Sequence, residues 1–443
     1  MSSPTATALL EAIDPWLRSQ RWCPATASTS LSCVWHQWRQ VGGHQSVTLV
    51  VAAGSALVHI PLLLSPNALT SPAPIGRCGQ DFLYDGPSHP LWRAEWAARA
   101  LQVEPSLGGS GDLVAACEAA TLVGGEQSNT SLLIPTQPTP LFLKVYRTLT
   151  AGTHPEVELC GALTRARWPH TPALRVSTEV DLPDGPALAT CAWDYLDGAR
   201  DGWAYYCDAA LTGSDLSALS FELGRVTRDM HTILGDSFPL SSIDEGGAPA
   251  LNAQRFAARI HEQITMVARD IPLDPALVDN AHALVADVGH LDDLPRPIRI
   301  HGDYHLGQTL LTDGASTWHI VDFEGEPLRP LAQRRSPDFA VKDVAGMLRS
   351  FDYAYGYAQR TAGLKSPEGK IPEIAAPQWW HEHTALPFLH GWAGPGGLAE
   401  NESRILRALL IEKTCYEIRY EQRMRPDWID IPLDALTRLC LSP

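Results

Sequence analysis

Excess positive charge and long apolar runs are both missing from this sequence. Its 443 residues carry a formal net charge of −16, which argues against nucleic acid or an anionic membrane surface as a partner. One apolar stretch, residues 47–64, is broken by Gly54, His59 and Pro61, whereas a membrane-spanning helix needs about 20 consecutive apolar residues. We therefore predict two short buried strands joined by a turn there, and no membrane partner.

Paired cysteine motifs are missing as well. The nine cysteines are scattered, odd in number and include no CxxC pair, so neither a disulfide framework nor a zinc site is indicated. Residues 1–17 contain no basic segment followed by an apolar run, so no signal peptide is expected. These features are typical of a reducing compartment, and they predict a cytoplasmic protein.

Acidic loops are what the sequence does contain, and they gather in residues 299–329. Apolar residues predict a strand before His301-Gly302-Asp303, then Gln308, a strand pair, and a second acidic loop at Asp322-Phe323-Glu324. Strand ends that deliver carboxylates into loops suit Mg²⁺, which prefers hard oxygen ligands. A phosphoryl-transfer site needs one further carboxylate to orient the attacking hydroxyl.

The spacing of these residues matches the catalytic apparatus of kinases. Protein kinases use H-R-D-x-x-x-x-N, in which an amide follows the catalytic Asp by five positions, as Gln308 follows Asp303 here. The motifs HGDYHLGQ, IVDFEGEP and RRSPDFAVKDVAGMLRSFDYA resemble those of aminoglycoside-phosphotransferase-like kinases, and closely those of maltokinases and actinobacterial glucosamine kinases. The resemblance, over roughly residues 110–435, implies that Asp303 is catalytic and contacts the acceptor. It also implies Mg²⁺ on Gln308 and Asp322, with Glu324 as a further metal candidate, and ATP as cosubstrate.

A strand-rich segment before this stretch resembles a nucleotide-binding lobe. The turn at residues 124–130 has no Gly-Lys-Ser, but it could offer backbone and hydroxyl groups to phosphates; a plain hairpin turn is the alternative. The candidate nucleotide contacts in this turn are Gln127, Ser128, Asn129 and Thr130.

Lys144 lies in the apolar run 141–146, where a lysine is costly unless it is paired. Kinases place such a lysine on the α- and β-phosphates and hold it with a glutamate of the next helix. The predicted helix 155–167 offers Glu156 and Glu158; we favour Glu158, and both stay open. A lysine that snorkels from an edge strand is the alternative.

The predicted terminal helix, residues 402–423, carries candidate acceptor contacts. Lys413, Tyr416, Glu417 and Tyr420 share one face by their spacing, which suits a sugar, although a solvated charged face is the alternative. The motif EKTCYEIRYE…RPDW resembles the maltokinase terminal motif that lines the acceptor pocket. His305 and Glu412 complete the candidate set.

Other residues near the site have structural interpretations. His231 is expected to be a packed histidine, and Asp338 a helix cap. Asp343 resembles an acidic residue that supports the catalytic loop. In residues 379–383 the two histidines are two positions apart and would not share a helical face, so no metal site is predicted there.

The expected fold is α+β and bilobal, like eukaryotic protein kinases and aminoglycoside phosphotransferases, with an N-terminal cap. We predict a cap over residues 1–105, a β-rich nucleotide-binding part over 106–198, and a mainly helical part with the catalytic loop and sugar pocket over 199–443. Residues 65–90, rich in Pro, Gly and Ser, are expected to form a long surface loop or a boundary.

The sequence thus predicts an ATP- and Mg²⁺-dependent sugar kinase, as a monomer or homodimer. Glucosamine, phosphorylated at its 6-hydroxyl, is narrowly favoured, because Glu412, Glu417 and Glu421 would place carboxylates opposite Asp303 to bind an ammonium group; Lys413 counts against this. The alternative is maltose, phosphorylated at its anomeric hydroxyl. A catalytically inactive kinase-like binding protein and a protein kinase are further alternatives.

Overall fold

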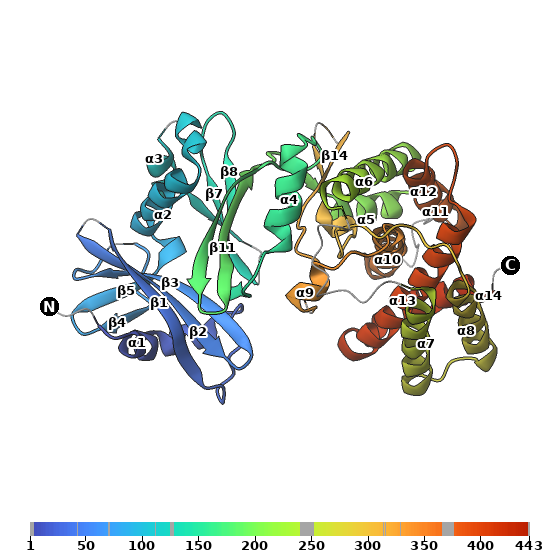
Figure 1. Ribbon diagram of the computed structural model, residues 1–443, viewed down its shortest axis with the longest axis horizontal. Helices are drawn as coiled ribbons and strands as arrows, with labels where there is room; N and C mark the ends of the chain where they lie inside the picture. The colour runs from blue at the N-terminus through green and yellow to red at the C-terminus, as the bar shows by residue number, and fades with distance from the viewer. Residues whose placement is uncertain are drawn as a thin grey trace. The chain divides into compact units, whose positions relative to one another are not determined.

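The computed structural model describes residues 4–41, 43–69, 71–110, 112–124, 128–239, 252–312, 314, 316–327, 329–365 and 376–441. The chain divides into two compact units (Figure 1). Unit 1 comprises residues 1–161 and 172–196, and unit 2 comprises residues 162–171 and 197–443. Unit 1 therefore takes in residues of both the proposed cap and the proposed nucleotide-binding part, and the three-part division stays a prediction.

The first sheet of unit 1 is antiparallel, with the strand order β1-β2-β3-β5-β4 and β9 beside β3. Its helix α1 (Ala6–Ser19) starts at Thr5, whose hydroxyl accepts a hydrogen bond from Ala8 N, and buries Leu9, Ile13 and Leu17. The strands are β1 (Leu31–Val41), β2 (His44–Ala53), β3 (Ala56–Ser65), β4 (Gly76–Cys78), β5 (Asp81–Asp85) and β9 (Thr148–Leu149). The two strands predicted in residues 47–64 are confirmed as β2 and β3.

The long surface loop or boundary predicted over residues 65–90 is wrong for residues 76–88. Strands β4 and β5 and a 3₁₀ turn (Gly86–Ser88) lie in this stretch, and Leu83 and Tyr84 are fully buried. Tyr84 pairs with Leu63 of β3. The apolar residues of β5 complete the sheet and its core, and this outweighs the local preference of Pro, Gly and Ser for loops.

The second sheet of unit 1 has the order β10-β11-β8-β7-β6. Its strands are β6 (Thr121–Val123), β7 (Asn129–Ile134), β8 (Leu141–Tyr146), β10 (Leu174–Leu182) and β11 (Gly185–Asp194). The helices of this unit also include α2 (Pro90–Val103) and α3 (Leu113–Glu118), while α4 (Pro155–Arg165) begins in unit 1 and ends in unit 2. Residues of α2 and α3 share one core with β7 and β8, including Trp92, Trp96, Leu132 and Leu143.

Unit 2 is mainly helical and contains one small sheet, in the order β12-β13-β14. Its elements are β12 (Arg200–Asp201), α5 (Gly202–Thr212), α6 (Ser217–Ser237), α7 (Ala253–Asp270), α8 (Pro275–Gly289), a 3₁₀ turn (Leu306–Gln308), β13 (Thr309–Thr312), β14 (Thr317–Ile320), α9 (Leu331–Arg334), α10 (Val341–Lys365), α11 (Pro377–His383), α12 (Ala385–Ala393), α13 (Glu400–Met424), a 3₁₀ turn (Pro426–Trp428) and α14 (Asp430–Leu441). Helix α10 packs against α5 and α13, which makes it the support of the site described below.

Two expectations for unit 2 are wrong. The strand predicted before His301 is only an isolated bridge, in which the backbones of Ile298 and Asp338 exchange two hydrogen bonds of 2.9 Å. Asp338 is not the cap of α10, which begins at Val341. Its carboxylate instead accepts hydrogen bonds from Phe339 N and from Lys342 Nζ.

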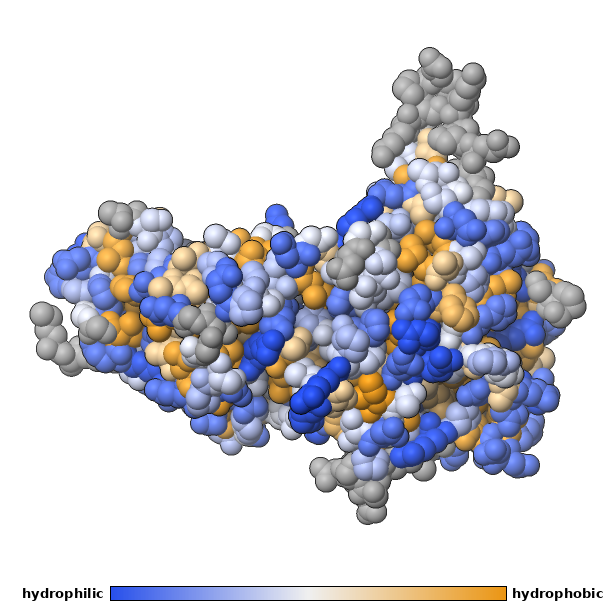
Figure 2. Space-filling view, turned by 90° about the horizontal axis from the view of Figure 1, so that it is seen from above, coloured by the Kyte–Doolittle hydropathy of each residue, from blue (hydrophilic) through white to orange (hydrophobic). Residues whose placement is uncertain are grey.

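The surface mixes polar and apolar residues. Figure 2 shows hydrophilic areas interspersed with smaller hydrophobic ones on the displayed face. Of the helices in the described ranges, none combines the length and apolar character that crossing a membrane would require. The cytoplasmic location and the monomeric or homodimeric state stay predictions.

Candidate active site

The catalytic loop at residues 301–308 and the loop that contains Asp322 are joined through His301 and a hairpin. His301 Nδ1 accepts a hydrogen bond from Asp303 N at 3.4 Å, so its Nε2–H donates to Val321 O at 3.0 Å. The β13–β14 register places Thr309 opposite Ile320, and Val321 N donates to Gln308 O at 3.0 Å. The two acidic loops predicted from the sequence therefore lie side by side.

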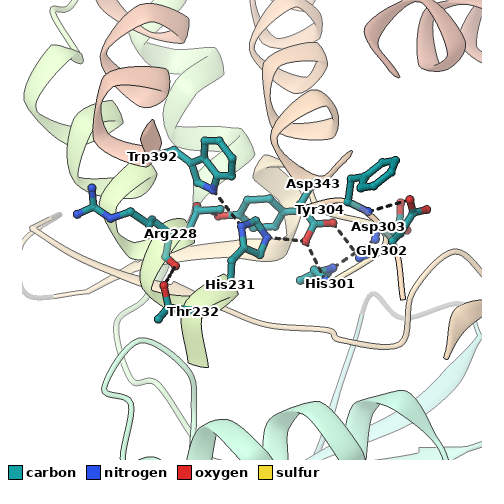
Figure 3. A network of polar contacts seen from close by, with 12 residues as sticks. Arg228, His231, Thr232, His301, Gly302, Asp303, Tyr304, Asp343 and Trp392 are labelled. Atoms are coloured by element: carbon teal, nitrogen blue, oxygen red, sulfur yellow. Dashed lines mark hydrogen bonds and ion pairs between the residues drawn. The ribbon is translucent and has the colours of Figure 1, made fainter. Parts of the chain in front are cut away.

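Asp343 fixes the backbone of the catalytic loop (Figure 3). Its carboxylate accepts hydrogen bonds from His301 N at 2.8 Å and Gly302 N at 2.9 Å. His231 Nε2 donates to it at 3.0 Å, while His231 Nδ1 accepts from Trp392 Nε1 at 2.9 Å. Burial by itself would raise the pKa of the Asp343 carboxyl. The hydrogen bond from His231 opposes this effect, together with His301 and the backbone N–H of Gly302, and the pKa lies below its ordinary value. The supporting role predicted for Asp343 and the buried position expected of His231 are confirmed.

Helix α10 supports the loop at two further positions on the same face. A Cβ atom at Gly346 would lie 2.5 Å from Tyr304 O, so only glycine allows this close approach. Ser350 Oγ accepts a hydrogen bond from Leu306 N at 3.1 Å. Asp343, Gly346 and Ser350 fall at i, i+3 and i+7, and one helical face thus positions the loop from His301 to Leu306.

Gln308 and Asp322 meet at a site that suits a magnesium ion. Gln308 Nε2 lies 3.0 Å from Asp322 Oδ2, and Asp322 has the uncommon left-handed backbone φ of 66°. No group of three or more His, Cys, Asp and Glu side chains suited to a metal occurs in the described residues. Here the amide N–H of Gln308 donates to Asp322, so the amide would have to turn over to present its oxygen. One carboxylate and one amide oxygen would then fit Mg²⁺, which usually takes one or two carboxylates and completes its shell with water and phosphate. Glu324 lies two residues on, and its carbonyl accepts from Arg334 Nη1 at 3.0 Å.

A cavity of about 680 Å³ borders the catalytic loop in unit 2. It is lined by six of the seven predicted acceptor contacts, namely Asp303, His305, Glu412, Lys413, Tyr416 and Tyr420. The rings of Tyr416 and Tyr420 stack with centroids 6.4 Å apart. The seventh residue, Glu417, lines an adjoining chamber of about 310 Å³ that also reaches His305 and Lys413. Burial lowers the pKa of His305, and nearby Asp303 opposes this effect.

Lys144 in unit 1 does not lie on a sheet edge. Its strand, β8, runs between β7 and β11, with Lys144 opposite Ser131 and Cys191, so the snorkelling edge-strand alternative is excluded. Its ammonium group lies 5.4 Å from the ring centroid of Tyr146. Glu156 is buried and accepts from Cys160 Sγ at 3.3 Å, whereas Glu158 is partly buried. Pairing of Lys144 with Glu158 stays a prediction.

Comparison with known proteins identifies the family. The model described as "Phosphotransferase enzyme family" matches residues 119–382. The chain belongs to this phosphotransferase family. Glucosamine kinases from Streptacidiphilus jiangxiensis and Mycolicibacterium smegmatis are each 28% identical to it, over 269 and 258 residues. These matches cover 57% and 56% of this chain, and 58% and 61% of the relatives, less than two thirds of either.

A solved structure extends the likeness to the whole chain. The structure described as "Glucosamine kinase in complex with glucosamine, ADP and inorganic phosphate" aligns with a TM-score of 0.65 and 21% identity, and covers 100% of both chains. At this identity the match shows a common fold. The expected α+β kinase-like fold of the phosphotransferase is confirmed.

The three glutamates predicted to line an acid-rich acceptor pocket, Glu412, Glu417 and Glu421, each have an arginine partner. Arg259 Nε lies 2.8 Å from Glu412 Oε1, Arg349 Nε 2.8 Å from Glu417 Oε2, and Arg425 Nη2 2.6 Å from Glu421 Oε1. Glu421 is almost fully buried and lines neither chamber. Two of these partners lie far away in sequence, 153 residues from Glu412 and 68 residues from Glu417, so spacing on one helix could not reveal them. Arg425 is only four residues from Glu421.

The sequence reasoning missed Glu326 and Arg329, which line the larger cavity of the phosphotransferase. Glu326 accepts a hydrogen bond from Arg329, and its Oε1 lies 3.9 Å from Lys413 Nζ. Glu326 therefore offsets part of the positive charge that Lys413 brings to the pocket. Glu326 belongs to the motif IVDFEGEP, and Arg329 ends the acidic-loop segment of residues 299–329, so both lay within the stretch that the sequence singled out.

Three of the predicted nucleotide contacts, Ser128, Asn129 and Thr130, have hydrogen-bond partners inside unit 1. Arg147 donates from its backbone N to Asn129 Oδ1 at 3.4 Å and from Nε to Thr130 Oγ1 at 2.8 Å. Ser128 Oγ accepts from Asn129 Nδ2 at 3.3 Å. These side chains brace the turn, so we expect phosphate contacts there to come from backbone groups; Gln127 lies outside the described residues.

Proposed function

We propose that this phosphotransferase is an ATP- and Mg²⁺-dependent sugar kinase that converts glucosamine to glucosamine 6-phosphate. The observation that carries the proposal is the position of Asp303, which stands beside Lys413, Tyr416 and Tyr420 at one cavity on a loop that Asp343 fixes. The two curated relatives, both named glucosamine kinase, support the choice of acceptor.

In the proposed reaction, the Asp303 carboxylate accepts the proton of the acceptor hydroxyl. The hydroxyl oxygen then bonds to the γ-phosphorus of ATP, the bond from that phosphorus to the β–γ bridging oxygen breaks, and ADP leaves. Asp322 and Gln308 would hold Mg²⁺, which when bound compensates phosphate charge. Lys144 would contact the α- and β-phosphates.

The cavity offers groups suited to an amino sugar. The stacked Tyr416 and Tyr420 rings are partly exposed, at 49% and 42%, and can pack against a sugar ring. His305 Nδ1 accepts from Gly307 N at 3.1 Å, so its Nε2–H can donate to a sugar hydroxyl, and burial lowers the pKa of this side chain. Asp303 borders the cavity and could face an ammonium group, whereas Glu326 already pairs with Arg329, as the glutamates favoured by the sequence pair with arginines.

Maltose is the second candidate acceptor, and one observation favours it. The adjoining chamber of about 310 Å³ is lined by Trp203, Tyr353 and Trp428, and aromatic faces of this kind would suit a second sugar ring. Because Glu412 and Glu417 pair with arginines, their negative charge no longer favours glucosamine over maltose. An inactive binding protein is disfavoured by Asp322 and Gln308 in contact beside the catalytic loop.

The proposal is tested by following ADP release from ATP with glucosamine and identifying the product by phosphorus NMR. We expect ADP and sugar phosphate in equal amounts, with the phosphorus coupled to the two protons on C6. A signal coupled to the anomeric proton would overturn the choice of hydroxyl. ATP binding without ADP release for any sugar would support the inactive binding protein.

A further inference from the structure

A second cavity of unit 2, which we call the α10–α14 cavity, contains no residue of the catalytic loop. It has a volume of about 430 Å³ and is lined by residues of α10, α11, α13 and α14, among them Arg349, Asp352, Arg360, Asp430, Asp434 and Arg438. Helices α10, α13 and α14 contact one another, and Figure 1 shows them grouped in this unit. The volume falls in the range typical of small-molecule sites.

A buried arginine with an unmet donor stands in the wall of this cavity. Arg349 is only 2% exposed, donates from Nε to Glu417 at 2.8 Å, and donates from Nη1 to Asp352. Its Nη2 has no hydrogen-bond partner in the part of the chain that the structure describes. That atom has almost no accessible surface, so a ligand in the cavity would bond instead to Asp352, the partner of Arg349 that also lines the cavity.

The charges of the α10–α14 cavity are balanced, which indicates the class of ligand. Three guanidinium groups face three carboxylates, and Arg438 Nη2 already donates to Asp352 at 2.9 Å, as Arg360 does to Asp430. An anion would meet the carboxylates and a cation the guanidinium groups. A hydroxyl group both donates and accepts, so a neutral polyhydroxylated molecule can bond to both kinds of group.

We propose that the α10–α14 cavity is a second binding site, specific for an uncharged sugar and separate from the acceptor pocket. Arg349 also lines the chamber next to the acceptor pocket, where it holds Glu417. Its helix, α10, fixes the catalytic loop through Asp343. A sugar that bonds to Asp352, which holds Arg349, therefore alters the affinity for the acceptor more than the chemical step.

Binding is tested by thermal denaturation with glucose, maltose and N-acetylglucosamine as probes. Arg438→Gln and Asp434→Asn remove lining groups from exposed positions on α14, Arg404→Gln is a charge-matched control at an exposed surface pair, and Tyr416→Ala alters the acceptor pocket. For at least one probe we expect a saturable rise in Tm for wild type, Arg404→Gln and Tyr416→Ala. Arg438→Gln and Asp434→Asn should need about tenfold more sugar for the same rise.

Two outcomes would overturn the proposal. One is a Tm rise that survives in Arg438→Gln and Asp434→Asn but is lost in Tyr416→Ala, since the sugar would then occupy the acceptor pocket. The other is the absence of any saturable rise with all three probes.

The coupling to the acceptor pocket rests on the proposed function and has its own readout. The bound sugar should change the KM for glucosamine at nearly constant kcat, and Arg438→Gln should remove this effect. An unchanged KM at saturating sugar would overturn the coupling. An enzyme that never phosphorylates glucosamine would refute the proposed function, while the result from thermal denaturation would still decide whether the site exists.

Discussion

Asp303 is the residue on which the proposed chemistry depends most directly. It borders the acceptor cavity, and its backbone N–H is bound to His301. Asp303→Asn keeps the shape of the side chain but cannot accept the hydroxyl proton. We expect turnover to fall about 10²–10⁴-fold with nearly unchanged ATP affinity, measured by steady-state kinetics and calorimetry. Wild-type turnover in this variant would show that Asp303 is not the base.

Asp322 is expected to act on the nucleotide through the metal ion. Asp322→Ala removes the carboxylate that lies 3.0 Å from the amide of Gln308 and should abolish Mg²⁺-ATP-dependent turnover. Calorimetric titration of ATP with and without Mg²⁺ should show that the ion no longer strengthens binding. A variant that still turned over at low Mg²⁺ would contradict this assignment.

Asp343 differs from Asp303 and Asp322, because it is buried and supports the backbone of the catalytic loop. Asp343→Asn replaces a carboxylate that accepts three hydrogen bonds, so we expect a loss of about 3–5 kcal/mol in the free energy of unfolding at pH 7. The pKa of this carboxyl is lower in the folded protein than its ordinary value. The carboxylate of Asp343 therefore contributes its full share to the free energy of unfolding at pH values above the ordinary pKa. That contribution is lost as the pH falls through and below the ordinary pKa.

Urea unfolding of wild type and Asp343→Asn at pH 7, 5 and 3.5 checks this account. The difference between the two proteins should be nearly constant from pH 7 to 5 and should shrink toward pH 3.5. A difference that grew on acidification would contradict the direction of the pKa shift.

At the scale of elements, helix α10 offers a matched pair of glycines. A Cβ atom at Gly346 would lie 2.5 Å from the backbone oxygen of Tyr304, while a Cβ atom at Gly356 would lie 2.4 Å from Ile431 Cδ1, a side-chain atom that can move. Gly346→Ala should thus displace the catalytic loop and lower kcat at least about tenfold, a barrier change of about 1.4 kcal/mol. Gly356→Ala should keep kcat within about twofold. Equal kcat values in the two variants would show that α10 does not position the loop.

The sequence predicted helices and strands well where buried apolar residues recur at a regular spacing. Val344, Met347, Leu348 and Phe351 fall on one helical face by spacing, and all four are buried. The pattern failed where a distant partner decides the structure. The residues before His301 meet only a short stretch of backbone near Asp338, so their apolar character does not produce a strand.

At the scale of the whole molecule, the predicted site residues divide between the two units. Asp303, Gln308, Asp322 and the acceptor cavity belong to unit 2, whereas Lys144 and the turn at residues 128–130 belong to unit 1. Motif spacing was enough to predict the contact between the loops of unit 2, because a short hairpin joins them. The arginine partners of Glu412 and Glu417 come from α7 and α10, and no local pattern on α13 could have indicated them.

The central claim is that glucosamine is the acceptor. The most direct test is a side-by-side comparison of kcat/KM for glucosamine, N-acetylglucosamine, glucose and maltose with saturating Mg²⁺-ATP. We expect the highest value for glucosamine, and a much lower one for N-acetylglucosamine, whose nitrogen carries no charge. A kcat/KM for maltose above that for glucosamine would contradict the account and assign the chain to the maltokinases.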